Sequence, residues 1–134
     1  MFRREVKVEL LRSVPLFSGC SQRELGRIAA IADEMRFPEG RTLIREGGIG
    51  REFFVVVDGT VEVRRRGRRV ALEGGPSYFG EAALLTGKPR NASVTTTSPV
   101  QALVITDRAF HRLLKDSPAI QGKILASLAA RFAD

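Results

Sequence analysis

The sequence predicts an α+β protein, mainly β, in which helices precede and follow a β-roll or jelly-roll barrel. Three observations predict this fold. Residues 1–34 carry helical patterns with a strong N-terminal capping signal. Residues 35–106 consist of short β-branched and aromatic runs separated by glycine-containing turns, as in sandwiches and barrels. Helical spacing of apolar residues then returns in residues 107–134.

The first 34 residues are expected to form two helices. The first runs from about Arg4 to Leu16 and is stopped by Pro15, because proline is poorly tolerated inside a helix. Ser21 and Glu24 lie three residues apart and predict a capping box at the start of the second. Apolar residues at helical spacing follow this box.

The central region is expected to form strands at "TLI", "EFFVVV", "TVEV", "RVAL" and "SYF". Asp58-Gly59, between two of these runs, predicts a β-hairpin, since Asp-Gly suits the tight hairpin turn. The segment "RNASVTTTSPVQALVIT" supplies two more strands, broken at Ser-Pro. The arginine run Arg64–Arg69, "RRRGRR", spans a predicted hairpin turn and is interpreted as a solvated tip.

Two helices are expected at the C-terminal end. Asp107 is expected to cap the first, and Ser117 with Pro118 supplies a cap and an N1 proline for the second. The second helix also contains Gly122, which costs on the order of 1 kcal/mol against alanine. Its apolar face is typical of a core or of a dimer seam and comprises Ile120, Ile124, Leu128 and Phe132.

Composition excludes several classes of function. One cysteine, Cys20, permits no intrachain disulfide, and one histidine, His111, is too few for a cupin-type metal site. Cys20 has no histidine near it in sequence, so the sequence does not support a catalytic thiol. We expect that the chain is not an enzyme and that it binds no metal ion. Without a signal peptide or a membrane-length apolar run, the chain is expected to be cytoplasmic and a single domain. The net charge of +7 attracts anions of any kind.

The segment Tyr78–Val94, "YFGEAALLTGKPRNASV", contains the candidate site. A short helix starting at Glu81 would present unpaired N–H groups to a phosphate, and Gly80 would let that phosphate approach closely. Arg90 could add a fixed cation whose donors match two phosphate oxygens. Glu81 would repel phosphate but can accept a hydrogen bond from a sugar hydroxyl. These features together describe a site for a nucleotide monophosphate.

Residues 79–94, "FGEAALLTGKPRNASV", resemble the phosphate-binding cassette of the cyclic nucleotide-binding domain. Protein kinase A regulatory subunits and the catabolite activator protein belong to that family. The resemblance covers nearly all of residues 1–134, as a helical lead-in, a β-roll that contains the cassette, and hinge and lid helices from residue 107 onward. It departs from the family at Asn91, where members carry alanine, serine or threonine, and at Pro76, where glycine is usual.

The resemblance implies a role for each matching residue. Glu81 would accept a hydrogen bond from the ribose 2′-hydroxyl, and Arg90 would pair with the cyclic phosphate. Backbone N–H groups of the cassette would bind sugar and phosphate, and polar residues of the last helix would reach the base. The expected ligand-binding residues are Phe79, Gly80, Glu81, Ala82, Ala83, Arg90, Asn91, Ala92, Ser127 and Arg131.

The expected function is an allosteric switch in signalling that binds cAMP in preference to cGMP, because no hydroxyl follows Arg90. A homodimer through the C-terminal helix is a candidate assembly, and the effector partner is not identified by the sequence. Nucleic acid is not expected as a partner, since no helix-turn-helix follows Phe132. The alternative is a degenerate domain that binds no nucleotide and docks a protein or nucleic acid through its arginine-rich surface.

Overall fold

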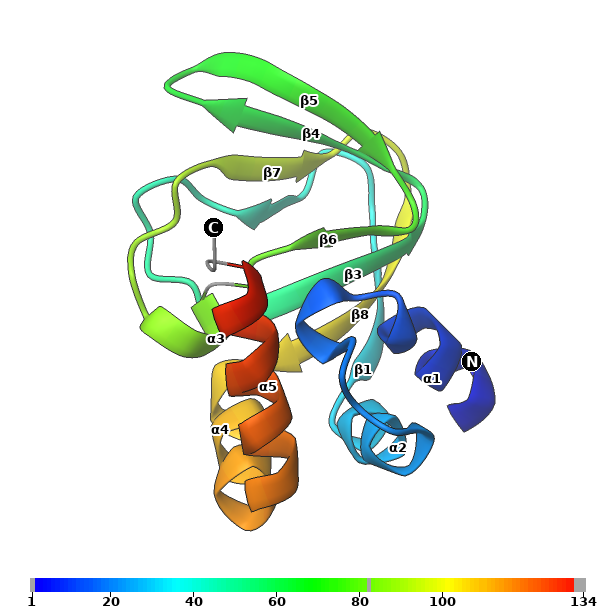
Figure 1. The fold of residues 1–134 in the computed structure, drawn as a ribbon. Helices are drawn as coiled ribbons and strands as arrows, with labels where there is room; N and C mark the ends of the chain where they lie inside the picture. Colours follow the sequence, from blue (N-terminus) through cyan, green and yellow to red (C-terminus); the bar gives the residue numbers. More distant parts are fainter. Residues whose placement is uncertain (1, 82, 132–134) are drawn as a thin grey trace. The chain divides into compact units, whose positions relative to one another are not determined.

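The computed structural model describes residues 2–81 and 83–131, which belong to two compact units (Figure 1). The β unit comprises Asp33–Asp107, and the helical unit comprises Met1–Ala32 with Arg108–Asp134. The predicted fold class, α+β and mainly β with helices at both ends of the chain, is confirmed. The division into lead-in, β-roll, hinge and lid stays a prediction.

The β unit consists of two antiparallel four-stranded sheets, with strand orders β1-β8-β3-β6 and β2-β7-β4-β5. The described strands are β1 (Asp33–Phe37), β2 (Thr42–Ile44), β3 (Glu52–Asp58), β4 (Thr60–Arg65), β5 (Arg68–Gly74), β6 (Ser77–Phe79), β7 (Ser93–Thr96) and β8 (Val100–Thr106). The two strands predicted on either side of Ser-Pro are therefore confirmed as β7 and β8.

Both sheets supply the apolar core of the β unit, because alternate residues of each strand point to the same face. Phe37 and Phe54 pack edge to face, with ring centroids 6.2 Å apart. The buried members of this core are Ile44, Phe54, Val56, Val61, Val94, Val100, Ala102 and Val104. This core fixes the relative position of the strands that carry the cassette.

The hairpin predicted at Asp58-Gly59 is wrong. β3 pairs with β6 and β8, whereas β4 pairs with β5 and β7, so the turn passes the chain from one sheet to the other. Gly59 has φ of +98°, and its carbonyl accepts a hydrogen bond from the Gly75 N–H at 3.2 Å. The Asp-Gly signal correctly marked a turn, but burial in the two sheets decided which strands pair.

The helical unit begins with α1 (Arg4–Arg12), the short 3-10 helix η1 (Pro15–Phe17) and α2 (Gln22–Ala30). α1 ends four residues earlier than predicted, because Pro15 starts η1 instead of continuing a helix. The capping box is confirmed: Ser21 Oγ accepts from the Glu24 N–H, and Glu24 Oε1 accepts from the Ser21 N–H.

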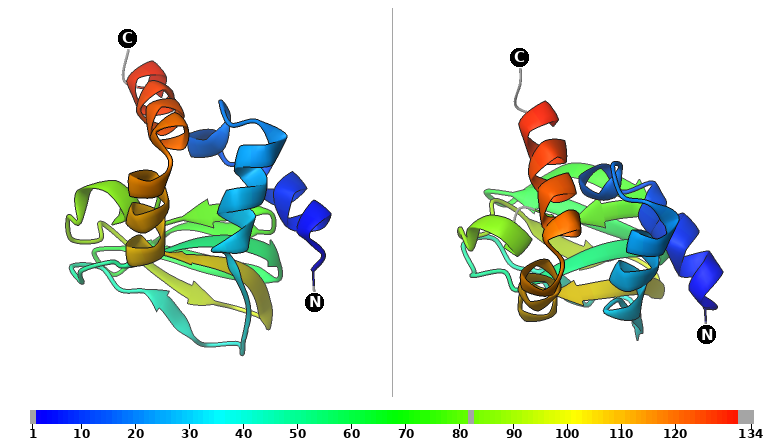
Figure 2. Two further views of the ribbon diagram at one scale, coloured as in Figure 1. Left: turned by 90° about the horizontal axis from the view of Figure 1, so that it is seen from below. Right: turned by 60° about the horizontal axis from the view of Figure 1, so that its bottom comes forward.

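The C-terminal helices are α4 (Asp107–Asp116) and α5 (Pro118–Arg131), and Figure 2 shows the chain changing direction between them. The predicted cap is confirmed, because Ser117 Oγ accepts a hydrogen bond from the Ile120 N–H at 3.3 Å. Ile120 and Ile124 are buried, whereas Leu125 is 59% exposed, and Phe132 lies outside the described residues. None of the described helices is long and apolar enough to cross a membrane.

We expect Gly122→Ala to raise the free energy of unfolding by about 0.5–1 kcal/mol, the helix-propensity difference between the two residues. A Cβ at Gly122 would meet nothing within 4 Å, so the methyl group fits without strain. Urea unfolding measures this change. The control is Ala126→Gly, at an exposed site of the same helix. This variant should have a free energy of unfolding that is lower by a similar amount. Destabilisation by Gly122→Ala would contradict the prediction.

An ion pair joins α2 to α5, with Lys123 Nζ 2.5 Å from Glu24 Oε1. The pKa of the Glu24 carboxyl is lowered from 4.5 to about 2, first by the hydrogen bond from Lys123 and then by that from the Ser21 backbone. Because the pKa is lower in the folded state, this contribution to stability is present above pH 4.5. It is lost as the pH falls toward 2.

We expect Lys123→Ala to reduce stability at pH 7 by about 0.5 kcal/mol, the size typical of a partly exposed ion pair. The difference from wild type should shrink as the pH falls to 3, where Glu24 of the variant becomes protonated. Urea unfolding at both pH values measures this, with Lys115→Ala as an exposed control. A difference that does not change with pH would contradict the assignment.

Candidate functional site

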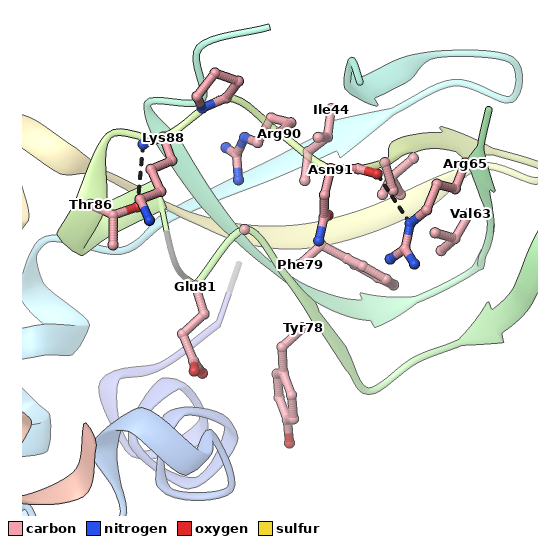
Figure 3. A pocket seen from close by; sticks show the side chains of 14 residues that line it. Ile44, Val63, Arg65, Tyr78, Phe79, Glu81, Thr86, Lys88, Arg90 and Asn91 are labelled. Carbon is pink, nitrogen blue, oxygen red and sulfur yellow. Dashed lines mark hydrogen bonds between the residues drawn. The ribbon is translucent and has the colours of Figure 1, made fainter. Parts of the chain in front are cut away.

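The β unit contains a pocket of about 580 Å³, within the size range of small-molecule sites (Figure 3). Ala82 lies outside the described residues, as do the side chains of Ala83 and Arg131. Ser127 is half-buried in the helical unit. The predicted ligand-binding residues that line the pocket are Phe79, Gly80, Glu81, Arg90, Asn91 and Ala92.

Arg90 is held in place by its backbone. Its N–H donates to the Gly48 carbonyl and its own carbonyl accepts from the Gly47 N–H, both at 2.8 Å. The neighbouring residues Ile49 and Pro89 form an antiparallel bridge. The segment after the cassette helix is therefore paired to the turn between β2 and β3, which fixes where the Arg90 side chain starts.

The Arg90 guanidinium lies against two glycines. A Cβ at either Gly50 or Gly80 would overlap it, so only glycine leaves room for this side chain. Nη2 donates to the Glu52 carbonyl at 2.5 Å. Gly80 also has φ of +90°, a left-handed conformation that glycine adopts without strain.

The environment of Arg90 favours an additional anionic partner. Its Nε is buried and has no hydrogen-bond partner in the part of the chain that the structure describes. Burial lowers the pKa of Arg90, and the charge of Glu52 partly opposes this shift. A buried donor without an acceptor is energetically unfavourable. An anion bound at this position would accept a hydrogen bond from Nε and would also compensate the positive charge of Arg90.

The cassette helix α3 (Ala83–Thr86) is shorter than predicted. The sequence predicted a helix starting at Glu81, but Glu81 lies in a turn before α3, and its carbonyl accepts from the Leu84 N–H at 3.2 Å. Leu84 is fully buried and anchors this turn. Figure 3 shows the Glu81 and Arg90 side chains on different sides of the pocket, so each can contact a different part of one ligand.

The sequence did not assign Arg65 or Lys88 to the pocket, yet both line it. Arg65 belongs to the predicted hairpin, which is confirmed by the pairing of Arg65 with Arg68 around a two-residue turn. The alternation along β4 could have revealed Arg65, because Val61 and Val63 lie on the same face. With Arg90, these residues give the pocket three cations and, in Glu81, one carboxylate, which favours an anionic ligand.

Cys20 lies outside this pocket, and its pKa is raised by burial and by the charge of Glu24. The thiol form therefore predominates, and that form is a poor nucleophile. Among the described residues, no three histidine, cysteine, aspartate or glutamate side chains gather into a group that could hold a metal ion.

Residues 34–117 match the family described as the cyclic nucleotide-binding domain. A match over most of the β unit and α4, together with the fold and the cassette geometry, shows that the chain belongs to this family. The resemblance found in the sequence is thereby confirmed.

The names of the relatives include both cyclic nucleotides, cAMP and cGMP. The cAMP-dependent protein kinase regulatory subunit of Mycosarcoma maydis is 36% identical over an alignment of 122 positions that covers 84% of this chain and 23% of the relative. The cGMP-dependent protein kinase of Toxoplasma gondii is 31% identical over 127 residues, which are 94% of this chain and 12% of the relative. The chain thus spans only a minor part of the curated relatives it matches.

Solved structures agree with the family assignment. The N-terminal domain of a transcriptional regulator from Streptomyces coelicolor A3(2) superposes with a TM-score of 0.85 at 27% identity, covering 92% of both chains. A structure of cAMP-bound PfPKA-R gives a TM-score of 0.71 at 25% identity, covering 94% of this chain and 47% of that one.

Proposed function

We propose that the chain binds a cyclic nucleotide in the β-unit pocket, with cAMP preferred over cGMP, and acts as a regulatory switch without catalysis. The observation that carries this proposal is the half-buried Arg90 side chain, whose guanidinium packs against Gly50 and Gly80 and whose buried Nε has no hydrogen-bond partner among the described residues. The names of the relatives, which include cAMP- and cGMP-dependent proteins, support the same ligand class.

The geometry of the pocket supports a role for each end of the ligand. Arg90 would pair with the cyclic phosphate, and the Gly80 backbone lies close enough to Arg90 to share that phosphate. Glu81 would accept a hydrogen bond from the ribose 2′-hydroxyl. The apolar side chains Val63 and Phe79 would contact the base.

The preference for cAMP is argued from Asn91. This residue lines the pocket directly after Arg90, at the position where a hydroxyl is associated with cGMP. Its amide is longer than a serine or threonine hydroxyl group and branches differently, so it would not place a single donor at the same point. We therefore keep cAMP as the favoured ligand.

The start of α4 offers a route by which a bound ligand could act on the following helices. The Asp107 N–H donates to the Arg51 carbonyl at 2.7 Å. Arg51 lies between Gly50, against which Arg90 packs, and Glu52, whose carbonyl accepts from Arg90. A ligand that draws the Arg90 guanidinium away would change the segment that holds the first residue of α4. Such a ligand shifts the switch only by its differential affinity for the two states.

Calorimetric titration with cAMP, cGMP and 5′-AMP tests the ligand class. We expect cAMP to bind most tightly and 5′-AMP, whose phosphate is open and carries more charge, to bind weakly. If no cyclic nucleotide binds the folded protein, the proposed function fails, and docking of a protein or nucleic acid through the arginine-rich surface becomes the function to test.

Amide hydrogen exchange at residues 121–127 of α5, with and without cAMP, tests the switch separately. We expect the exchange rates to change on binding, because α5 would close over the base or exchange its partner. Equal rates in both states, at saturating cAMP, would show that the chain binds the nucleotide without moving this helix.

A further inference from the structure

The tip of the β4–β5 hairpin concentrates positive charge in a way that a solvated turn does not require. Arg64 lies opposite Arg69 and Arg65 lies opposite Arg68 in the strand register, and like charges opposite each other are unfavourable. Arg64 is compensated by Glu62, with which it forms an ion pair. Arg65 has no carboxylate partner in the described part of the chain.

Arg65 instead reaches the nucleotide pocket. It follows Val61 and Val63 on the same face of β4, and Val63 also lines the pocket. Its Nε donates to the Asn91 carbonyl at 3.2 Å, which fixes the guanidinium at the pocket wall (Figure 3). Among the described residues, no hydrogen bond engages its two terminal nitrogens, so both can donate to a ligand.

Arg65 and Arg90 serve different parts of this pocket. Arg90 packs against Gly80 and Gly50, so a phosphate paired with it would lie near the cassette turn. Arg65 comes from a different strand, beside the apolar wall where the base is expected. A planar arginine fork in that position would face the edge of a bound purine.

We propose that Arg65 is a specificity-determining residue that hydrogen-bonds the purine edge and makes cGMP a second ligand of the pocket. Guanine presents two adjacent acceptors, O6 and N7, which a guanidinium can contact together, whereas adenine presents an acceptor at N7 beside a donating amino group. Arg65 would therefore raise the affinity for cGMP and reduce the difference between the cAMP and cGMP affinities. Without Arg65, the preference for cAMP argued from Asn91 would be larger. This inference rests on the proposed cyclic nucleotide function.

The test is calorimetric titration of cAMP, cGMP and cIMP into wild type, Arg65→Ala and Arg65→Lys. We expect Arg65→Ala to weaken cGMP and cIMP, which share O6 and N7, by about tenfold or more, while cAMP changes much less. Arg65→Lys should not restore cGMP binding, because lysine keeps the charge but lacks the planar fork. Arg69→Ala, on the opposite face of the same hairpin, should leave all three affinities unchanged.

Each other outcome overturns the assignment. Equal weakening of all three nucleotides by Arg65→Ala, matched by recovery in Arg65→Lys, would mean that Arg65 supplies only a general positive field. No change in any affinity would mean that it does not touch the ligand. Failure of the proposed function is distinguishable, because wild type itself would then bind none of the three nucleotides. Thermal unfolding of each variant shows whether it is folded.

Discussion

Replacing Arg90 with alanine is expected to weaken cAMP binding by on the order of a hundredfold or more. The substitution removes the charge and the bidentate donors proposed to meet the phosphate, and such charge-assisted pairs are among the strongest polar contacts. It also leaves a space between Gly50 and Gly80 that water would fill. Calorimetric titration of cAMP into both proteins measures the loss.

Two controls make the Arg90 result specific. Arg90→Lys keeps the charge but loses the fork, so we expect it to restore only part of the affinity. Arg69→Ala removes one charge from the exposed face of the β4–β5 hairpin and should leave cAMP affinity nearly unchanged. Unfolding by urea without ligand should show Arg90→Ala to be folded, because the substitution removes a buried unpaired donor. Retained cAMP affinity in a folded Arg90→Ala protein would refute the proposed site.

The parts of the site predicted from sequence are those set by local chemistry. Gly80 and Glu81 are adjacent, so any fold that exposes one to a ligand brings the other near it. Arg90 follows Glu81 by nine positions, and its planar fork together with the resemblance to the cassette pointed to it as the phosphate partner. The structure brings these residues to one pocket, although their contacts with a ligand stay predictions.

Residues that reach the pocket through strand pairing were harder to predict. Arg65 is separated from Asn91 by 26 positions, and only the pairing of β4 with β7 brings them together. In a run of five arginines, composition gives no reason to single out one. The alternation along β4 places Arg65 on the same face as Val61 and Val63. To predict that Arg65 reaches the pocket, one must also know which face of β4 points inward.

The turn at Gly59 shows the same limit for the fold. Asp-Gly predicts a tight turn from local backbone preference, and the chain does turn there. Whether the flanking strands pair with each other depends on which neighbours bury them. β3 pairs with β8 and β6 in one sheet, whereas β4 pairs with β7 and β5 in the other. The chain therefore crosses between the sheets at the turn where the local signal predicted a hairpin.

Gly59→Ala is expected to destabilise the protein by about 2–4 kcal/mol. A Cβ there would overlap the Pro99 carbonyl oxygen and lie 2.9 Å from Val100 Cγ2 and 3.0 Å from Val100 Cα. Two of these three atoms are backbone, and Val100 is buried in the core, so neither side can move cheaply. The left-handed conformation adds about 1 kcal/mol for any side chain, and overpacking adds about 1–3 kcal/mol.

Gly40→Ala separates these two contributions. Gly40 has φ of +84°, close to the +98° of Gly59, but a Cβ at Gly40 would meet nothing within 4 Å. It should therefore cost only the conformational part, about 1 kcal/mol. Urea unfolding measures the loss of unfolding free energy in both variants. The difference between the two losses is the cost of overpacking where the Gly59 turn contacts the start of β8. Equal destabilisation would mean that the turn tolerates a methyl group and that close packing does not require glycine at the crossing between sheets.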